Sequence, residues 1–409
     1  MHRVRTHEPV REQAVIRFEM PDDDLPQDHA ARLIWRVLGT IDLAAFTKDA
    51  RAIEGRAGRS VTSPRMMLTL WLYAISIGIG SAREIARQIE SDRAFAWIAG
   101  GESVSHHALS IFRVGHGAAL DKLMTDVLAS LLHQELLSLD LVAQDGTRLR
   151  ASASAPSFRS ARALAECREQ AALHLKAVLA QADDPELSAQ QKAARIAAAR
   201  DYQKRVEAAI ATVQTLAAEG KEKPRASTTD AEARVMKMPD GGFRPGYNVQ
   251  LATAGSELGG PRTIVGVRVT NVGSDFSSVT PMLDDIERRT GQLPKQLLAD
   301  ANHADLDSIR DAAARGVEAL ISVPERMQAA GENAAHDAPV AAWRHRMSTE
   351  PAKRTMKARA SLCELSNAHL KCHHGLAQLL LRGRERVTCV VLLGAIAANV
   401  LAHAARLLA

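Results

Sequence analysis

The sequence LDLVAQDGTRLRA (residues 139–151) marks the point where the hydrophobic pattern of the chain changes. Before it, residues 27–137 carry apolar side chains at helical spacing, as in Ala31–Leu38 and Met66–Ile79. Within it, residues 139–145 and 147–151 read as two paired strands around a turn at Gly146. The change predicts a helical N-terminal part, followed by a part that contains a sheet and begins near residue 138.

The rest of the chain alternates predicted strands and helices. Strands are expected at 247–253, 263–270, 295–300 and 317–323, helices at 275–289, 306–315 and 353–374, and a polar loop near 325–350. The Ala-rich residues 156–220 predict a hairpin of two long amphipathic helices. Such a hairpin can reach DNA, contact a second subunit or be a structural insertion. Without an insertion at about 154–226, three antiparallel strands precede parallel strands with crossover helices. That order predicts an α/β ribonuclease H-like domain with a mixed five-stranded sheet.

The composition is that of a globular chain long enough for two or three domains, with 409 residues, 46% apolar and 24% charged. Aromatic residues are only 3%, which argues against nucleic-acid binding by extensive base stacking. The net charge is +5 and the pI about 9.1. Between Pro351 and Arg386, eight Lys or Arg residues stand beside only two acids, Glu364 and Glu385. Because a solvated helix normally mixes signs, this segment predicts contact with a polyanion.

The cysteines and the chain ends fit a cytosolic protein. Four cysteines are scattered without a disulfide framework, as in a reducing compartment. The cysteines and histidines of residues 363–374 match no common zinc spacing and are expected to be core or surface residues of a helix. We expect no signal peptide, because no apolar core follows the N-terminal residues. Residues 387–409 are apolar but interrupted by Asn399, His403 and Arg406, which favours a packed core helix over a membrane span.

Three acidic residues, far apart in the chain, stand where metal ligands are expected. Asp145 ends a strand, Asp300 follows the apolar run 296–299, and Glu364 lies in the basic helical segment. Phosphodiester cleavage needs an activated oxygen nucleophile and a stabilised leaving oxygen, which two divalent ions about 3.5–4 Å apart can supply. Hard ions such as Mg²⁺ prefer oxygen ligands. Three carboxylates converging from separate elements therefore predict a two-cation site.

Each acid also has a structural interpretation. Taken singly, Asp145 and Asp300 fit turn or capping residues, and residues 145–147 read as a hairpin turn. Glu364 is harder to explain in this way, because the positions three and four residues away hold no basic side chain. An acid without a partner on its own helix points to a metal or to a partner outside the helix. Lys357 and Lys371 would share its face and could grip phosphates, although Lys357 is better explained as a solvated lysine.

At these residues the chain resembles bacterial insertion-sequence transposases of the DDE class, and the resemblance covers most of the sequence. In the N-terminal part it is carried by residues 26–34, 64–84 and 111–113. In the core it is carried by residues 145–147, 246–250, 298–301 and 359–364, followed by Lys371 and by residues 382–383. The order and spacing of these motifs together are more specific than any one of them.

The resemblance implies Mg²⁺-dependent cleavage of double-stranded DNA, with Mn²⁺ able to substitute, followed by strand transfer through the freed 3′-hydroxyl. It implies catalytic and metal-binding roles for Asp145, Asp300 and Glu364. It implies DNA contacts by Arg359, Lys371 and Arg113. The partners would be terminal inverted repeats and target DNA, bound by a homodimer in the bacterial cytoplasm at the nucleoid, with no membrane association.

The expected domains follow from these assignments. Residues 1–137 would form a helical DNA-binding domain that begins with an extended arm at 1–26. Residues 138–375 would form the catalytic domain, and the C-terminal helix in 376–409 would pack on it. The helices around Gly100-Gly101 fit a helix-turn-helix and a plain bundle equally well.

The chain departs from the family pattern at three places. Asn302-His303 stand where Gly-Tyr is common, Met356 replaces a Tyr, and Leu365 follows Glu364 in place of Pro. We expect His303 on the surface, and Asp230 in a structural role at a strand start. Two other functions stay open: a repurposed or inactive DNA-binding protein, and a metal-dependent nuclease that does not join DNA.

Overall fold

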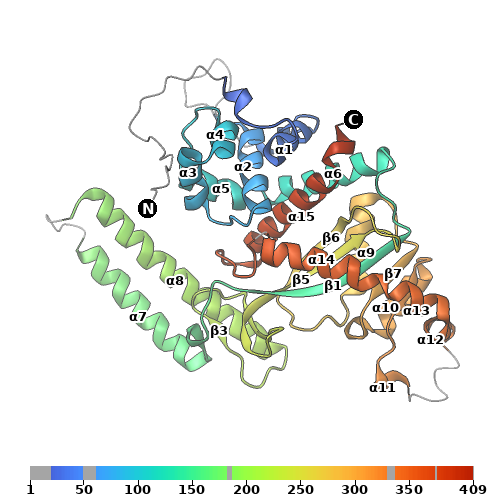
Figure 1. Ribbon diagram of the computed structural model, residues 1–409. Coiled ribbons are helices and arrows are strands. Elements are labelled where there is room, and N and C mark those ends of the chain that lie inside the picture. The colour runs from blue at the N-terminus through green and yellow to red at the C-terminus, as the bar shows by residue number, and fades with distance from the viewer. Residues whose placement is uncertain (1–19, 49–60, 182–186, 329–336, 374, 409) are drawn as a thin grey trace, which may run out of the picture.

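The structure is a computed structural model that describes residues 20–48, 61–181, 187–328, 337–373 and 375–408 (Figure 1). Most of the arm expected at residues 1–26 lies outside these residues. The described part of it forms a short 3₁₀ helix, η1 (Pro21–Asp24), in which Asp22 pairs with Arg32. This end of the predicted arm is therefore attached to the first α-helix.

Every described element from Pro21 to His133 is a helix. They are α1 (Ala30–Leu38), η2 (Ala44–Phe46), α2 (Pro64–Ser76), α3 (Ala82–Ser91), α4 (Arg93–Ala99), α5 (His106–Gly115) and α6 (Gly117–His133). Local signals set the helix starts: the side chain of Ser63 accepts from the backbone N–H of Met66, and that of Ser81 from Glu84. The central α2 is buried along almost its whole length, as its apolar sequence predicts.

The sheet has the predicted strand order with one extra strand. Its members are β1 (Leu141–Arg150), β4 (Arg234–Lys237), β5 (Phe243–Ala254), β6 (Thr263–Thr270), β7 (Gln296–Ala299) and β8 (Glu318–Ile321). The main order is β6–β5–β1–β7–β8, antiparallel as far as β1 and parallel beyond it. The unpredicted β4 pairs with the first residues of β5 and makes the sheet six-stranded. This mixed sheet is compatible with a ribonuclease H-like fold.

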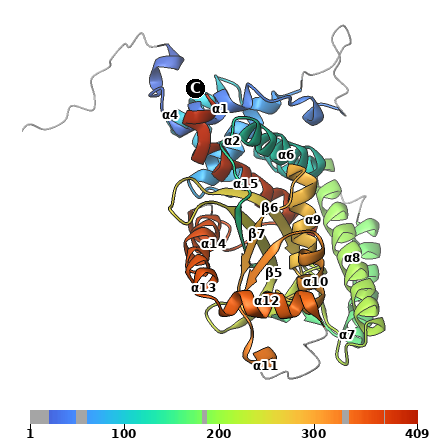
Figure 2. The same ribbon diagram turned by 90° about the vertical axis from the view of Figure 1, so that its right-hand side faces the viewer.

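Helices cover the two faces of the sheet (Figure 2). On one side lies α9 (Val279–Thr290), with α10 (Leu306–Ala314) beside it. On the other side lie α13 (Glu350–Met356) and α14 (Ala358–Ala368), with Leu362 and Cys363 of α14 packed on Leu141 and Ala143 of β1. Face X is our name for the α14 side of the sheet, and face Y for the α9 side.

The C-terminal helix α15 (Arg384–Leu407) joins the helical part to the sheet. It packs against α1, α2, α5 and α6 as well as β6, and so belongs to more than the sheet domain alone. Its Asn399 donates to and accepts from the backbone of Ile264, at 2.8 Å each. The helix is long and apolar enough to cross a membrane, but 78% of its most apolar window is buried inside the protein. This burial agrees with the core helix expected from the sequence.

The insertion is a helical hairpin, as predicted. Helices α7 (Ala161–Ala180) and α8 (Ala189–Ala218) lie side by side and project from the body (Figure 1). A two-stranded ladder of β2 (Phe158–Arg159) and β3 (Ala226–Ser227) closes its base. The hairpin core is thin, with Leu164 of α7 packed against Ala209 and Val213 of α8.

Three predictions about local structure were wrong. β1 runs without a turn through Gly146, which pairs with Gln250 in the ladder with β5. The predicted polar loop at 325–350 contains α11 (Glu325–Gln328) and α12 (Ala338–Ser348), because Asp337 caps α12 and buried Trp343 donates to the carbonyl of Ile321. The predicted helix 353–374 is broken at Lys357, and after α14 it continues as a π-helical turn, η6 (His369–His373). Lys357 and Lys371 therefore do not share one ideal helix with Glu364.

Candidate active site

The strand register places Asp145 and Asp300 beside each other. In the parallel ladder, Ala143 of β1 pairs with Leu298 of β7. Asp145 lies two residues beyond Ala143, and Asp300 lies two residues beyond Leu298. Side chains in a strand alternate between the two faces of the sheet with a period of two. Asp145 on face X and Asp300 just after β7 are thus at one level of the neighbouring strands.

Helix α14 brings Glu364 to the same region. Cys363, the preceding residue, is buried against Ala143 and Leu298. Burial raises the pKa of the Cys363 thiol, and the charges of Asp145, Asp300 and Glu364 raise it further, against the opposing charge of Arg359. The charges of all three predicted acids therefore act on one buried thiol. Cys363 packs in the core, which is one of the two places expected for it.

Asp145 is half-buried and holds two hydrogen bonds. One carboxylate oxygen accepts from the backbone N–H of Gly146 at 3.0 Å, and the other accepts from the side-chain amide of Asn367 at 2.9 Å. Burial raises its pKa, while the nearby Arg359 and His303 act in the opposite direction. The contact from α14 to Asp145 is thus made by Asn367, which lies one helical turn beyond Glu364.

Asp300 caps the short 3₁₀ turn η4 (Ala301–His303). Its carboxylate accepts from the backbone and side-chain amides of Asn302 at 2.9 and 3.0 Å, and lies 2.6 Å from Nδ1 of His303. Burial acts to raise the pKa of Asp300, but the contacts with His303 and Asn302 outweigh it and hold the pKa at about 2. Asp300 is therefore ionised at any physiological pH.

The expectation of a surface His303 was wrong, because its side chain is fully buried. Nε2 of the ring faces the side-chain oxygen of Gln250 at 3.2 Å, and the amide of Gln144 donates to that same oxygen at 3.1 Å. The residues that depart from the family pattern, Asn302 and His303, are thus the ones that hold Asp300. The sequence signal for the burial of His303 was the presence of two glutamines, Gln144 and Gln250, inside otherwise apolar strands.

Face Y of β1 continues this polar network. Asp275 accepts from the side-chain amides of Gln250 at 2.6 Å and Asn248 at 2.8 Å, and pairs with Arg148 at 3.0 Å. A Cβ on Gly146 would collide with Asp275 and Gln250. The glycine after Asp145 therefore permits close approach of side chains, and the turn role that the sequence suggested is replaced by this packing role.

Glu364 stands apart from this network. It is exposed, and the described residues offer it no hydrogen-bond or ion-pair partner. Within the described ranges, no three His, Cys, Asp or Glu side chains are close enough to share a metal ion. The structure thus places Asp145 near Asp300 and leaves Glu364 exposed on α14, without a three-carboxylate cluster among the described residues.

The predicted DNA-contact residues have different surroundings. Arg359 is half-buried near Asp145, and Lys371 lies in the π-helical turn after α14. Arg113 is buried in the helical part, where it donates to the carbonyl of Gly80 at 2.7 Å and stacks over Trp71. Burial lowers the pKa of Arg113 to about 10. Because its guanidinium is turned inward, we do not carry the predicted DNA contact of Arg113 forward.

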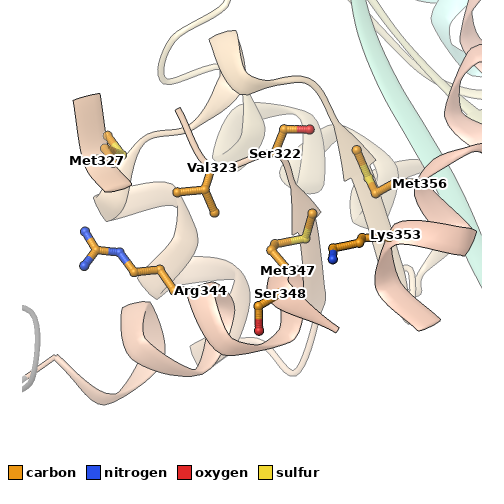
Figure 3. A pocket seen from close by; sticks show the side chains of 8 residues that line it. All are labelled: Ser322, Val323, Met327, Arg344, Met347, Ser348, Lys353 and Met356. Atoms are coloured by element: carbon orange, nitrogen blue, oxygen red, sulfur yellow. The ribbon is translucent and has the colours of Figure 1, made fainter. Parts of the chain in front are cut away.

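A cavity of about 550 Å³ lies past the end of β8, and its lining side chains come from several elements (Figure 3). They are Ser322, Val323, Met327, Arg344, Met347, Ser348, Lys353 and Met356. None of the three acids is among them. The acids therefore lie outside this pocket.

Two family models match the chain. A transposase domain (DUF772) matches residues 19–114, and a transposase DDE domain matches residues 308–402. The second match includes Arg359, Glu364 and Lys371, whereas Asp145 and Asp300 lie outside both. Searches of curated proteins and of solved structures gave no match.

Proposed function

We propose that this chain, which its two family matches support as an insertion-sequence transposase of the DDE class, binds the terminal inverted repeats of its element and catalyses DNA cleavage and strand transfer. The observation that carries the catalytic part is the β1–β7 register, which aligns Asp145 with Asp300 beneath α14. Glu364 would be the third acidic ligand. The proposed domains are 1–137 for DNA recognition, 138–375 for catalysis and 376–409 for the C-terminal helix.

The side chains present suit Mg²⁺ or Mn²⁺. The donors are carboxylate oxygens, which hard divalent ions prefer, and Asp300 is held in its ionised form. When bound, a pair of such ions would activate the attacking oxygen and stabilise the leaving oxygen. The chain would contribute by orienting Asp300 through His303 and Asn302, and by turning the exposed Glu364 toward the two aspartates.

DNA would be held by cations on both sides of the acids. On face X these are Arg359 and Lys371. At the base of the helical hairpin, a cleft of about 800 Å³ is lined by Lys221, Lys223 and Arg225, with Glu219 as the acid among its lining residues. These three cations are exposed and have no ion-pair partner among the described residues. Unpaired cations in a cleft are what a phosphate backbone requires.

Recognition of the terminal repeat would belong to the helices of residues 1–137. Helix α4 ends at Gly100 in the left-handed conformation, and α5 begins after the cap Ser105. This pair remains open to both a helix-turn-helix role and a bundle role. A homodimer is proposed because transposition brings two element ends together.

The proposal is tested by incubating labelled element ends with the protein and Mg²⁺. Wild type should nick and join the ends, and Asp145→Ala, Asp300→Ala and Glu364→Ala should each abolish both steps. Asp307→Ala is the matched control, because Asp307 is 89% exposed and pairs only with Arg310 on the surface. Binding without any cleavage by wild type would favour a DNA-binding protein, and cleavage without joining would favour a nuclease.

The hairpin cleft is tested separately. The double variant Lys221→Gln/Lys223→Gln should lower the slope of log affinity against log salt by about 2, since each lost phosphate contact removes about 0.9. Lys176→Gln/Lys204→Gln is the control, because these exposed lysines lie on the same hairpin but outside the cleft. Equal salt slopes for the two double variants would show that the lysines of the cleft do not contact DNA.

A further inference from the structure

Asn367 has an unusual position beside Asp145. It lies on α14, is 8% exposed, and donates from its side-chain nitrogen to Asp145 at 2.9 Å. Its side-chain oxygen is also buried, yet no described residue donates a hydrogen bond to it. Leaving a buried polar atom unpaired is unfavourable, so such an atom calls for an explanation.

The orientation of the amide follows from the carboxylate it meets. An ionised Asp145 only accepts hydrogen bonds, so the amide presents its N–H end and the carbonyl end is left over. The two ends of the amide differ in chemistry: the nitrogen can donate a hydrogen bond to the metal-free carboxylate, and the oxygen can coordinate a cation. Rotation about the terminal side-chain bond exchanges them without moving α14.

The neighbours of Asn367 favour a cation as the partner of this oxygen. Glu364 precedes it by three residues, and residues at this spacing share one face of a helix. Glu364 is therefore exposed one turn before Asn367 on α14, while Asn367 reaches Asp145. Carboxylates combined with amide carbonyls are a ligand set of hard divalent ions.

We propose that Asn367 is an additional ligand of the divalent ion held by Asp145. With no ion, the amide donates to Asp145 and keeps that carboxylate oriented; with the ion, the amide turns and its oxygen joins the coordination shell. The inference rests on the proposed metal site and adds to it a neutral ligand outside the acidic triad. It also accounts for the unpaired oxygen, which the ion would satisfy.

The experiment measures Mn²⁺ affinity of the full-length, metal-free protein by electron paramagnetic resonance, without DNA and without activity. Asn367→Leu removes both polar ends at similar volume, and Asn367→Asp keeps two oxygens but removes the N–H donor. Ser366→Ala is the control on the same helix, because its hydroxyl bonds only the carbonyl of Leu362. Thermal unfolding of each variant shows whether the fold is retained, and Asn367→Ser replaces the leucine variant if that one does not fold.

If Asn367 supplies an oxygen ligand, Asn367→Leu should weaken Mn²⁺ binding about 10-fold or more, in the range that loss of metal-site partners causes. Asn367→Asp should bind at least as tightly as wild type, and Ser366→Ala should be unchanged. Two results would overturn the inference: wild-type affinity in Asn367→Leu, or equal weakening in the leucine and aspartate variants. The second result would show that Asn367 acts only by donating to Asp145.

Failure of the proposed function would look different. If wild type binds no Mn²⁺, or if Asp145→Ala binds as tightly as wild type, the metal site itself is absent. If Asp145→Ala loses binding while Asn367→Leu keeps it, the metal site stands and only the role of Asn367 is wrong. The same set of titrations therefore separates the two proposals.

Discussion

The two faces of β1 differ in how their charged side chains are paired. On face Y, Arg148, Asn248, Gln250 and Asp275 are connected by hydrogen bonds and an ion pair, and the side-chain oxygen of the neighbouring Gln144 is buried and unpaired. On face X, Glu364 has no partner among the described residues, and the side-chain oxygen of Asn367 is buried and unpaired.

This contrast has a physical meaning. A buried network that is mutually satisfied makes the backbone around it rigid. A site whose ligand-binding side chains lack partners needs a rigid network on the opposite face of the sheet to hold those side chains in position. Face Y therefore acts as the support, and face X carries the groups that our proposal assigns to metal and DNA. The following variants test this division.

The largest effect is expected from Asp275→Ala on face Y. Asp275 is 4% exposed, and its loss removes a charged acceptor from Arg148 and from the side-chain amides of Asn248 and Gln250. Breaking a buried pair in this way costs about 3–5 kcal/mol, which urea unfolding would measure. Asp284→Ala is the control, since Asp284 is 61% exposed in its pair with Arg315 and should lose less than about 1 kcal/mol. Equal losses would mean that face Y does not carry the stability we assign to it.

Gly146→Ala should destabilise the protein by about 3 kcal/mol, because overpacking and disrupted polar contacts act together. The new methyl group would meet Asp275 and Gln250. Gly241→Ala is the informative comparison: Gly241 has a φ of 83° and nothing near its absent Cβ, so only backbone strain of about 1–2 kcal/mol is expected. A smaller loss at Gly146 than at Gly241 would contradict the packing role.

Gln250→Leu should cost about 2 kcal/mol, because it leaves buried partners in the network unpaired. It should also weaken Mn²⁺ binding about 10-fold, since His303 loses the contact that fixes it against Asp300. Urea unfolding and Mn²⁺ titration measure the two effects on the same sample. A stability loss with unchanged metal affinity would show that the two faces are not coupled through His303.

The smallest stability effect is expected at Glu364. Glu364→Gln should change the free energy of unfolding by less than about 0.5 kcal/mol, as for an exposed side chain without partners. Added Mn²⁺ at 100 times its dissociation constant should stabilise wild type by about 2.7 kcal/mol, and the variant by less. A large loss of stability without metal would place Glu364 in a structural contact instead.

The nearness of Asp145 to Asp300 agrees with the sequence prediction, and the contacts that the prediction lacked share one character. Asp145 and Asp300 were recognisable because each follows an apolar run that reads as a strand, and the order of strands implied that the two runs are neighbours. Glu364 was recognisable by the lack of a partner on its own helix. The supporting roles of His303, Gln250 and Asn367 were not predicted. His303 is close to Asp300 in sequence, but its ring is held by Gln250, 53 residues away, and Asn367 acts on Asp145, 222 residues away.

The local errors have a similar origin. A glycine after an aspartate reads as a turn when only neighbours in sequence are considered, whereas here Gly146 makes room for the side chains of Asp275 and Gln250. Helix α12 was predicted as a loop because the role of Trp343 depends on its burial against β8. The resemblance implied a DNA contact for Arg113, and the sequence did not reveal its burial, which depends on the packing of α2 against α5.

Periodicity and charge are properties of neighbouring residues, so the sequence alone predicted most of the order of elements, the apolar runs before Asp145 and Asp300, and the excess of positive charge near Glu364. The tertiary structure was needed to show that Asp145 lies inside β1 at the level of Asp300, and that Asn367 and not Glu364 contacts Asp145. Strand register and helix rotation set these contacts, and both depend on packing between segments that are distant in the chain.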